Sequence, residues 1–290
     1  MSDVILVTGA AGKTGQAVIK ALLERNQSVR ALVHREKQAQ TFKALGIQVV
    51  SGDLRSDATL RDAVRGVEAI YHICPNVDPN ELSIGRAFIS AARSTGINRF
   101  VFHSVLHPQA ESMPHHWLKL RVEEVLFESK LQFTILQPAA YMQNVLSEWR
   151  NMLEQGVYSV PYSVEAPLSL VDLDDVADAA ANVLCEHGHV GGIYELSGPE
   201  ILTPREMATT IGNHLGREVR AQTMPIDDWK RHAEKSGLGS YQVETLVKMF
   251  DYYDRYGLWG NPEVLRGLLK RSPTRFEEFV KRIVREQTPY

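Results

Sequence analysis

Short apolar segments alternate with longer amphipathic segments along the first half of the chain. The apolar segments have the length and composition of buried strands, and the segments between them repeat apolar residues with the helical period. Strands without a polar face indicate a parallel sheet that helices cover on both sides. Right-handed crossovers then predict a doubly wound α/β fold of the Rossmann type. The expected strands are residues 4–8, 29–33, 47–51, 69–73, 99–104 and 133–136, and the expected helices are residues 15–25, 36–45, 57–64, 81–94 and 116–128.

The alternation becomes less regular after Pro138. We predict a Rossmann-type domain over residues 1–155, with its sheet completed by residues 169–197. A smaller, mainly helical domain over residues 156–290 is expected to cover the substrate. Within this second half the pattern predicts a strand at 192–196 and helices at 176–185, 204–215, 226–236, 242–256 and 274–286.

Composition and charge restrict the partners of this 290-residue chain, which has a formal net charge of −3. Its basic residues are scattered and form no helix-turn-helix charge pattern, which argues against direct contact with nucleic acid. No segment approaches the roughly 18 apolar residues of a membrane helix, and the first residues lack the pattern of a signal peptide. Cys74 and Cys185 lie outside any CxxC or Cys/His pattern, which favours a reducing compartment. We expect a cytoplasmic monomer or homodimer without a membrane partner.

A glycine-rich segment, Thr8-Gly9-Ala10-Ala11-Gly12-Lys13-Thr14-Gly15, lies between the first expected strand and the first expected helix. Gly9 allows a tight turn, Gly12 lets the backbone approach a pyrophosphate, and Gly15 lets helix and strand pack closely. The free amides and the helix dipole then face the phosphates. This position in the chain favours a dinucleotide site over a purely structural turn.

The end of the second expected strand indicates which dinucleotide is bound. His34 and Arg35 stand where an acidic residue would bind a ribose 2′-hydroxyl, and Lys37 follows. A guanidinium can bind a 2′-phosphate that a carboxylate would repel. The pattern therefore favours NADP(H), with NAD(H) as the alternative, and Lys13 can add positive charge. The other interpretation is that Arg35 is an ordinary surface arginine.

Three further strand ends supply candidate contacts to the cofactor. Asp53 and Leu54 follow the third strand, where they could contact the adenine, although Asp53 could equally cap the next turn. Ile73-Cys74-Pro75 follows the fourth strand, and we interpret Cys74 mainly as a small buried hydrophobic residue. Pro138 follows the sixth strand and is expected to line the nicotinamide pocket.

In these segments the chain resembles the NmrA-like group of atypical short-chain dehydrogenase/reductases. The resemblance continues beyond the glycine-rich segment, Arg35 and Gly52-Asp53-Leu54, and it covers most of the chain. It includes the segments 115–119 (HHWLK), 136–138 (LQP), 171–177 (VDLDDVA) and 192–199 (GIYELSGP). The resemblance implies NAD(P)H binding, because this group holds quinone and triphenylmethane reductases as well as redox-sensing regulators.

The same resemblance implies a candidate catalytic set. Typical short-chain dehydrogenases carry Tyr-x-x-x-Lys on one helix and a serine at the end of the preceding strand. Lys119 keeps the lysine position and Ser104 the serine position, whereas His115 stands in place of the tyrosine. The Lys119 ammonium is expected to keep His115 neutral. Tyr141 is a second candidate proton donor, or else a wall of the pocket.

Other polar clusters have simpler interpretations. No carboxylate at suitable spacing completes a ligand set with His107, His115 and His116, so we expect no metal site. The acidic residues Asp172, Asp174 and Asp175 precede a helix, where capping and dipole interactions explain them.

The sequence alone leaves two possible functions open. The first is an NADP(H)-dependent oxidoreductase that transfers hydride to a small quinone-like or other conjugated organic acceptor, a reaction that demands less of an acid than carbonyl reduction. The second is a non-catalytic NADP(H) sensor that acts through a protein partner. A sugar-nucleotide epimerase is disfavoured because that class relies on the tyrosine that His115 replaces.

Overall fold

The computed structural model describes residues 4–97 and 99–287, which form two compact units. The sheet unit comprises residues 4–97, 99–109, 115–137 and 176–194 of this part. The C-terminal unit comprises residues 110–114, 138–175 and 195–287. None of the described helices is both long enough and apolar enough to cross a membrane. The domain boundary near residue 155 stays a prediction.

A seven-stranded sheet has the strand order β10-β6-β5-β4-β1-β2-β3. The strand β1 lies between β2 and β4, so the chain reverses its direction of progress across the sheet at the carboxyl ends of β1 and β4. Such a switch point is where doubly wound folds bind ligands. The strands are β1 (Val4–Val7), β2 (Ser28–Val33), β3 (Gln48–Ser51), β4 (Ala69–His72), β5 (Arg99–His103), β6 (Phe133–Pro138) and β10 (Ile193–Leu196).

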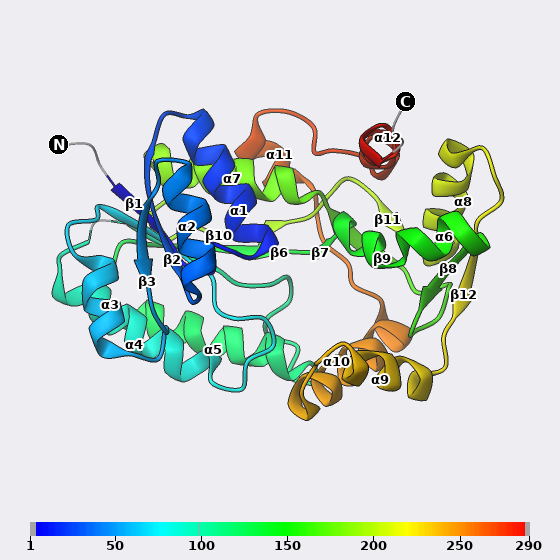
Figure 1. The fold of residues 1–290 in the computed structure, drawn as a ribbon, viewed down its shortest axis with the longest axis horizontal. Helices are drawn as coiled ribbons and strands as arrows, with labels where there is room; N and C mark the ends of the chain where they lie inside the picture. Colours follow the sequence, from blue (N-terminus) through cyan, green and yellow to red (C-terminus); the bar gives the residue numbers. More distant parts are fainter. Residues whose placement is uncertain (1–3, 98, 288–290) are drawn as a thin grey trace. The chain divides into compact units, whose positions relative to one another are not determined.

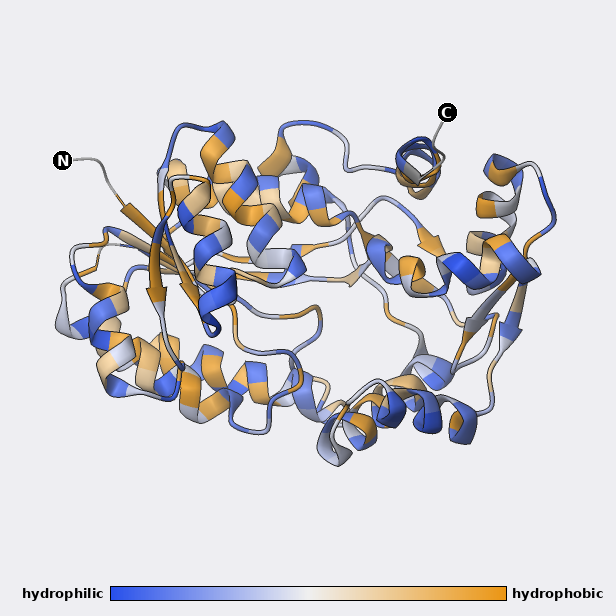
Figure 2. Ribbon diagram, viewed as in Figure 1, coloured by the Kyte–Doolittle hydropathy of each residue, from blue (hydrophilic) through white to orange (hydrophobic). Residues whose placement is uncertain are grey.

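Helices cover both faces of this sheet (Figure 1). On one face α3, α4 and α5 bury a core that includes Leu60, Phe88 and Val122. On the other face α1 and α7 lie side by side, and Arg25 pairs with Asp178 at 3.0 Å. In Figure 2 the central strands are hydrophobic along their length, as both-sided burial requires. The helices are α1 (Lys13–Glu24), α2 (Glu36–Ala44), α3 (Asp57–Val64), α4 (Glu81–Ser94), α5 (Pro114–Glu128) and α7 (Leu173–Cys185).

The predicted α/β fold class, with a parallel Rossmann-type sheet, is confirmed. The main difference between the predicted and the observed elements is where two helices begin. The helix α5 begins at Pro114 and α7 begins at Leu173, each earlier than the periodicity predicted. Proline at a first helical position needs no amide partner, which explains the early start of α5. Within the segment 169–197, β10 joins the sheet beside β6, whereas β9 pairs with β7 and β11.

The C-terminal unit combines helices with two small sheets, β11-β9-β7 and β12-β8. Its short strands carry little periodicity and were not predicted. The strands are β7 (Ala140–Tyr141), β8 (Val157–Val160), β9 (Leu168–Val171), β11 (Ile201–Leu202) and β12 (Arg220–Thr223). The helices are a 3₁₀ segment (Met142–Glu148), α6 (Trp149–Gln155), α8 (Pro204–Leu215), α9 (Ile226–Lys235), α10 (Ser240–Tyr256), α11 (Glu263–Leu269) and α12 (Phe276–Gln287).

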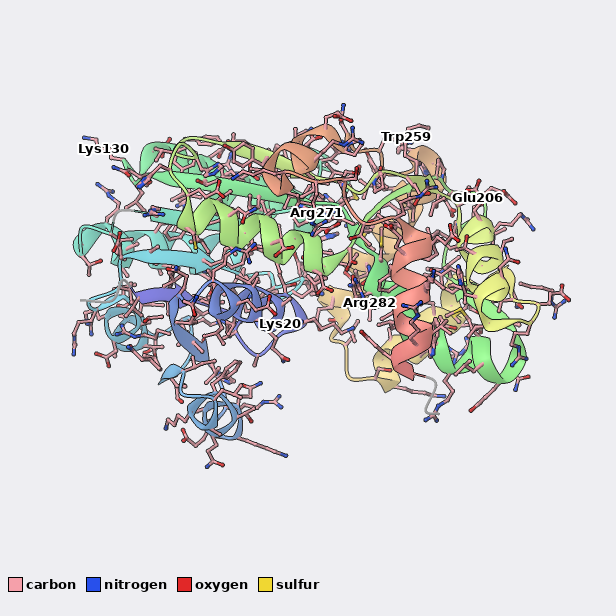
Figure 3. The ribbon with its side chains drawn as sticks, turned by 90° about the horizontal axis from the view of Figure 1, so that it is seen from above. Lys20, Lys130, Glu206, Trp259, Arg271 and Arg282 are labelled. Atoms are coloured by element: carbon pink, nitrogen blue, oxygen red, sulfur yellow. The ribbon has the colours of Figure 1, made fainter. Side chains whose placement is uncertain are left out.

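Two buried carboxylates before and within α7 bind arginines of the C-terminal segment, which Figure 3 labels. Asp172 accepts a 2.7 Å bond from Arg282, and Asp175 lies 2.7 Å from Arg271. Asp172 also accepts from the amide of Asp174 at 3.2 Å, which is the expected capping role. Burial raises the pKa of Asp175, and the Thr274 amide and Arg271 oppose that shift. These carboxylates therefore fasten the C-terminal segment within its unit as well as capping α7.

Candidate active site

The glycine-rich segment begins with a buried threonine that ties β1 to the end of β4. The Thr8 amide donates to the Tyr71 carbonyl at 3.0 Å. Its hydroxyl donates to the Ile73 carbonyl at 2.9 Å and accepts from the Ile73 amide at 2.8 Å. Both strand ends at the switch point are therefore held as one unit.

A histidine completes this arrangement from within the core. His72 Nδ1 lies 3.0 Å from the Thr8 hydroxyl oxygen. Because the threonine proton is directed to Ile73, we assign the proton of the imidazole to Nδ1, from which it donates to Thr8. The ring stacks on Phe88 with centroids 4.5 Å apart, and Nε2 has no partner. Burial and the charge of Lys119 lower the pKa of His72 to about 3, so it is neutral.

The geometry of the loop requires glycine at two of its three glycine positions. Gly9 has a φ of +59°, in the left-handed region. A Cβ on Gly15 would lie only 2.4 Å from the Gly9 carbonyl oxygen, so α1 can approach the loop only with glycine there. Gly12 is the N-cap of α1 and offers no side chain to cap it, and the first turn of the helix contains no acid. This open, uncapped helix start suits a diphosphate.

The other loop residues lie around that helix start. Ala11 and Thr14 are half-buried, whereas Lys13 is exposed. The Ala11 carbonyl accepts a 2.8 Å bond from the Gln16 side chain of α1. The phosphate contacts expected for this segment stay a prediction.

Exposed basic side chains follow β2. His34, Arg35 and Lys37 are all exposed, and Arg35 is the N-cap residue of α2. An acid, Glu36, also stands here, and the sequence prediction did not weigh it. Its carboxylate lies 3.5 Å from Lys43 and accepts a 3.4 Å bond from Ser51, so it is already engaged. The 2′-phosphate role of Arg35 stays a prediction.

The residues after β3 show the turn that was the alternative interpretation of Asp53, and the adenine contact stays a prediction. Asp53 Oδ1 accepts a 2.9 Å bond from the Arg55 amide, which is a local turn. Leu54 is half-buried and packs against the core beneath the sheet. A Cβ on Gly52 would lie 2.2 Å from the Thr59 hydroxyl, so a larger residue there would displace the Thr59 side chain.

The thiol after β4 is not a reactive group. Cys74 is buried, and burial together with Glu81 raises the pKa of its thiol far above the ordinary value. The thiol therefore stays protonated at neutral pH, and Cys74 packs as a small apolar side chain. The neighbouring Pro75 is exposed.

Lys119 forms a buried ion pair that sequence reasoning missed. Its Nζ lies 2.7 Å from Glu81 Oε1, and the two side chains are 14% and 1% exposed. Glu81 is the first residue of α4, whereas Lys119 lies on α5. Spacing within one helix cannot reveal a partner on another helix, although an acid in the first turn of α4 is a recognisable capping signal.

Ser104 is paired with another carboxylate. Its hydroxyl donates to Glu123 Oε1, and the Gln137 side chain donates to the same carboxylate at 3.0 and 3.1 Å. Glu123 is 2% exposed, and burial raises its pKa while Ser104 and Gln137 oppose that shift. His115, Lys119 and Glu123 are spaced by four residues on α5, so they share one face of the helix.

His115 is buried and neutral. Burial, His116 and Lys119 lower its pKa to about 3, and its Nδ1 has no partner. Its ring meets that of His116 edge-on at 4.5 Å, and His116 Nδ1 bonds the His107 carbonyl at 3.2 Å. Among the described residues, no three His, Cys, Asp or Glu side chains gather in a way that could hold a metal ion.

Two predicted site residues belong to the C-terminal unit. Pro138 is buried at the end of β6, and Tyr141 is half-buried on β7, where it pairs with Val171 of β9. Their roles at the nicotinamide stay predictions.

The close approach at Gly15 predicts the effect of one methyl group. We expect Gly15→Ala to lower the free energy of unfolding by about 3 kcal/mol, because the Cβ meets backbone that cannot move freely. The matched control is Gly267→Ala in α11, where a Cβ meets nothing within 4 Å and a gain of up to about 1 kcal/mol is expected. Urea unfolding measures both, and equal effects would contradict this packing.

The buried histidines predict an acid-sensitive fold. Their pKa values are lowered to about 3 in His72, His103 and His115 and to about 4 in His116. The unfolded chain therefore takes up protons below about pH 6.5 that the folded chain refuses. The stability contributed by neutral histidines is complete above that pH and is lost as pH falls toward 4. Urea unfolding between pH 7.5 and 5 should show this decline in the free energy of unfolding. In His103→Gln the slope of that free energy against pH should be smaller by the equivalent of about one proton. A slope unchanged in that variant contradicts the assignment.

Several known proteins resemble this chain in sequence and fold. The NAD(P)H azoreductase of Xenophilus azovorans is 28% identical over 279 residues, which cover 96% of both chains. The (4-alkanoyl-5-oxo-2,5-dihydrofuran-3-yl)methyl phosphate reductase of Streptomyces griseus subsp. griseus is 33% identical over 226 residues, 77% of this chain and 78% of that one. The NADPH-dependent quinone oxidoreductase QOR2 of Escherichia coli, solved with NADPH, superposes with a TM-score of 0.85 at 26% identity and covers 97% of this chain and 99% of that one. The model of the NmrA-like family matches residues 1–280, and the chain therefore belongs to the NmrA-like family.

Proposed function

We propose that this protein is an NADP(H)-dependent oxidoreductase that reduces a quinone-like or other conjugated organic acceptor. The observation that carries the proposal is the turn from Gly9 to Gly15, which has no space for a Cβ at Gly15 and opens onto the uncapped start of α1. The relatives support the same chemistry, because they are named as reductases of azo compounds, a quinone and an unsaturated lactone. In each of these acceptors a conjugated π system receives the electrons.

Separate parts of the sheet edge would hold the cofactor. The amides at the start of α1 would bind the pyrophosphate, with Lys13 adding charge. Arg35, with His34 and Lys37, would bind the 2′-phosphate. Asp53 would contact the adenine, and Ile73 with Cys74 would line the pocket at the end of β4. Lys119 would donate to the hydroxyls of the nicotinamide ribose. NADP(H), when bound, supplies the hydride at C4 of its nicotinamide.

The protonation of the site favours acceptors that need no strong acid. His115 stands where a tyrosine would donate a proton, and its lowered pKa of about 3 leaves no imidazolium at neutral pH. The Ser104 hydroxyl donates to Glu123, so its proton is already directed to a carboxylate. A quinone or an azo group can take its hydride first and its proton from solvent afterwards, whereas a simple ketone needs both together.

The same contacts give the second candidate function its support. Lys119 is paired with Glu81, Ser104 is paired with Glu123, and His115 is neutral. A site whose serine is bonded to a carboxylate and whose histidine is neutral has little acid to donate, and it can bind a dinucleotide without turning it over. Such a protein would report the state of the NADP(H) pool to a protein partner.

Turnover separates the two functions. We expect the protein to oxidise NADPH with 1,4-naphthoquinone or an azo dye and to be inactive with simple ketones. Lys119→Met is expected to lower kcat/KM for NADPH by about 100-fold, because it removes the donor to the ribose. Absorbance at 340 nm measures the rate. Tight NADPH binding without turnover of any acceptor would favour the sensor.

Arg35 predicts the choice between the two dinucleotides. Replacing Arg35 with Asp removes the partner of the 2′-phosphate and adds a charge that repels it. We expect Arg35→Asp to weaken NADPH binding by about 100-fold while NADH binding changes little. Fluorescence titration with each dinucleotide measures the ratio, and Arg61→Asp on the exposed surface of α3 is the control. An unchanged ratio in Arg35→Asp excludes Arg35 from the site.

A further inference from the structure

The ion pair between Lys119 and Glu81 is unusual in its burial. Most surface ion pairs contribute little, whereas a buried carboxylate without a partner is strongly destabilising. Glu81 is 1% exposed and Lys119 is 14% exposed, so neither charge can be hydrated fully. Each side chain therefore restricts where the other can lie.

Glu81 is itself held in place by the loop between β4 and α4. Its amide donates to the Asp78 carbonyl at 3.1 Å. The Asp78 carboxylate accepts a 2.8 Å bond from the Asn80 amide and a 2.6 Å bond from Arg55, which follows β3. The start of α4 is thus fixed by contacts within the loop after β4 and by an arginine from the segment after β3.

The same loop contains a strained residue. Val77 is buried, yet its φ of +49° lies in the left-handed region that β-branched residues avoid. Such strain persists only where the surrounding contacts over-determine the backbone, and it often marks a functional segment. Here the strained loop leads directly to the carboxylate that binds Lys119.

The surroundings of Lys119 supply few other partners. Its Nζ lies 5.7 Å from the centre of the Phe102 ring, and the nearby His72, His103 and His115 are neutral. Glu123, one turn further along α5, is occupied by Ser104 and Gln137. Among the described residues, Glu81 is the carboxylate that lies within ion-pair distance of Lys119.

We propose that Glu81 is a positioning residue for Lys119, which it holds at the sheet edge with one N–H engaged and two N–H groups left for the nicotinamide ribose. The proposal rests on the proposed function. An ammonium has three donors, so one bond to Glu81 still permits a bidentate contact with a pair of hydroxyls.

A double-mutant cycle tests this dependence. If Glu81 acts through Lys119, Glu81→Gln should lower kcat/KM for NADPH by about tenfold, with the KM for 1,4-naphthoquinone nearly unchanged. The double variant Glu81→Gln/Lys119→Met should be no less active than Lys119→Met alone. A purely structural role predicts a lower Tm and unchanged kinetic constants in the folded enzyme, and losses that add in the double variant also overturn the proposal.

A second variant covers the case in which Glu81→Gln does not fold. Glu81→Asp keeps the charge and the acid in the first turn of α4, but it shortens the side chain by one methylene. The ammonium must then move to keep its partner, and a loss of about fivefold in kcat/KM for NADPH is expected. Wild-type kinetics in Glu81→Asp would overturn the positioning role.

A readout without cofactor separates this proposal from the proposed function. Acetic anhydride acetylates accessible, unrestrained lysines, and peptide mass spectrometry follows each site. Lys119 should react several-fold faster in Glu81→Gln than in the wild type, whereas Lys20, exposed on α1 (Figure 3), should not change. Faster labelling of Lys119 in Glu81→Gln would support the positioning contact even if the wild-type protein fails to bind NADPH. That failure would refute the proposed function. Unchanged labelling of Lys119 refutes the positioning role even in an active enzyme.

Discussion

The close approach of α1 to the loop after β1 is the contact on which the rest of the site depends. A Cβ at Gly15 would lie 2.4 Å from the Gly9 carbonyl oxygen and 2.7 Å from the Ala10 Cα, so only glycine allows helix and loop to meet. That contact directs the uncapped amides of α1 toward the switch point of the sheet. Thr8 and His72 then fix the loop to the end of β4.

Burial determines the chemistry at that edge. Four histidines are kept neutral there, the Cys74 thiol stays protonated, and the positive charge of Lys119 is balanced by Glu81. Desolvation is the largest cause of each of these shifts. These groups provide little general acid, which is why the proposed acceptors are ones that can be protonated late.

The sequence predicted the parts of the structure that depend on local pattern. Apolar strands and helical periodicity gave the α/β fold class, and the position of Gly9, Gly12 and Gly15 predicted the turn found in the structure. What it missed depends on contacts between distant residues. Glu81 and Lys119 lie on different helices, and Glu123 meets Ser104 only after α5 packs on the sheet. The short strands of the C-terminal unit were missed because two to four residues carry too little periodicity.

Binding of the NADP(H) pyrophosphate by the backbone amides at the start of α1 can be tested directly by NMR. Amide resonances of ¹⁵N-labelled protein report on each N–H separately. We expect added NADPH to shift the resonances of Gly12, Lys13, Thr14 and Gly15 far more than those of α9 or α10. Saturation with NADPH that leaves these four resonances in place would show that the dinucleotide binds elsewhere and would exclude this phosphate site.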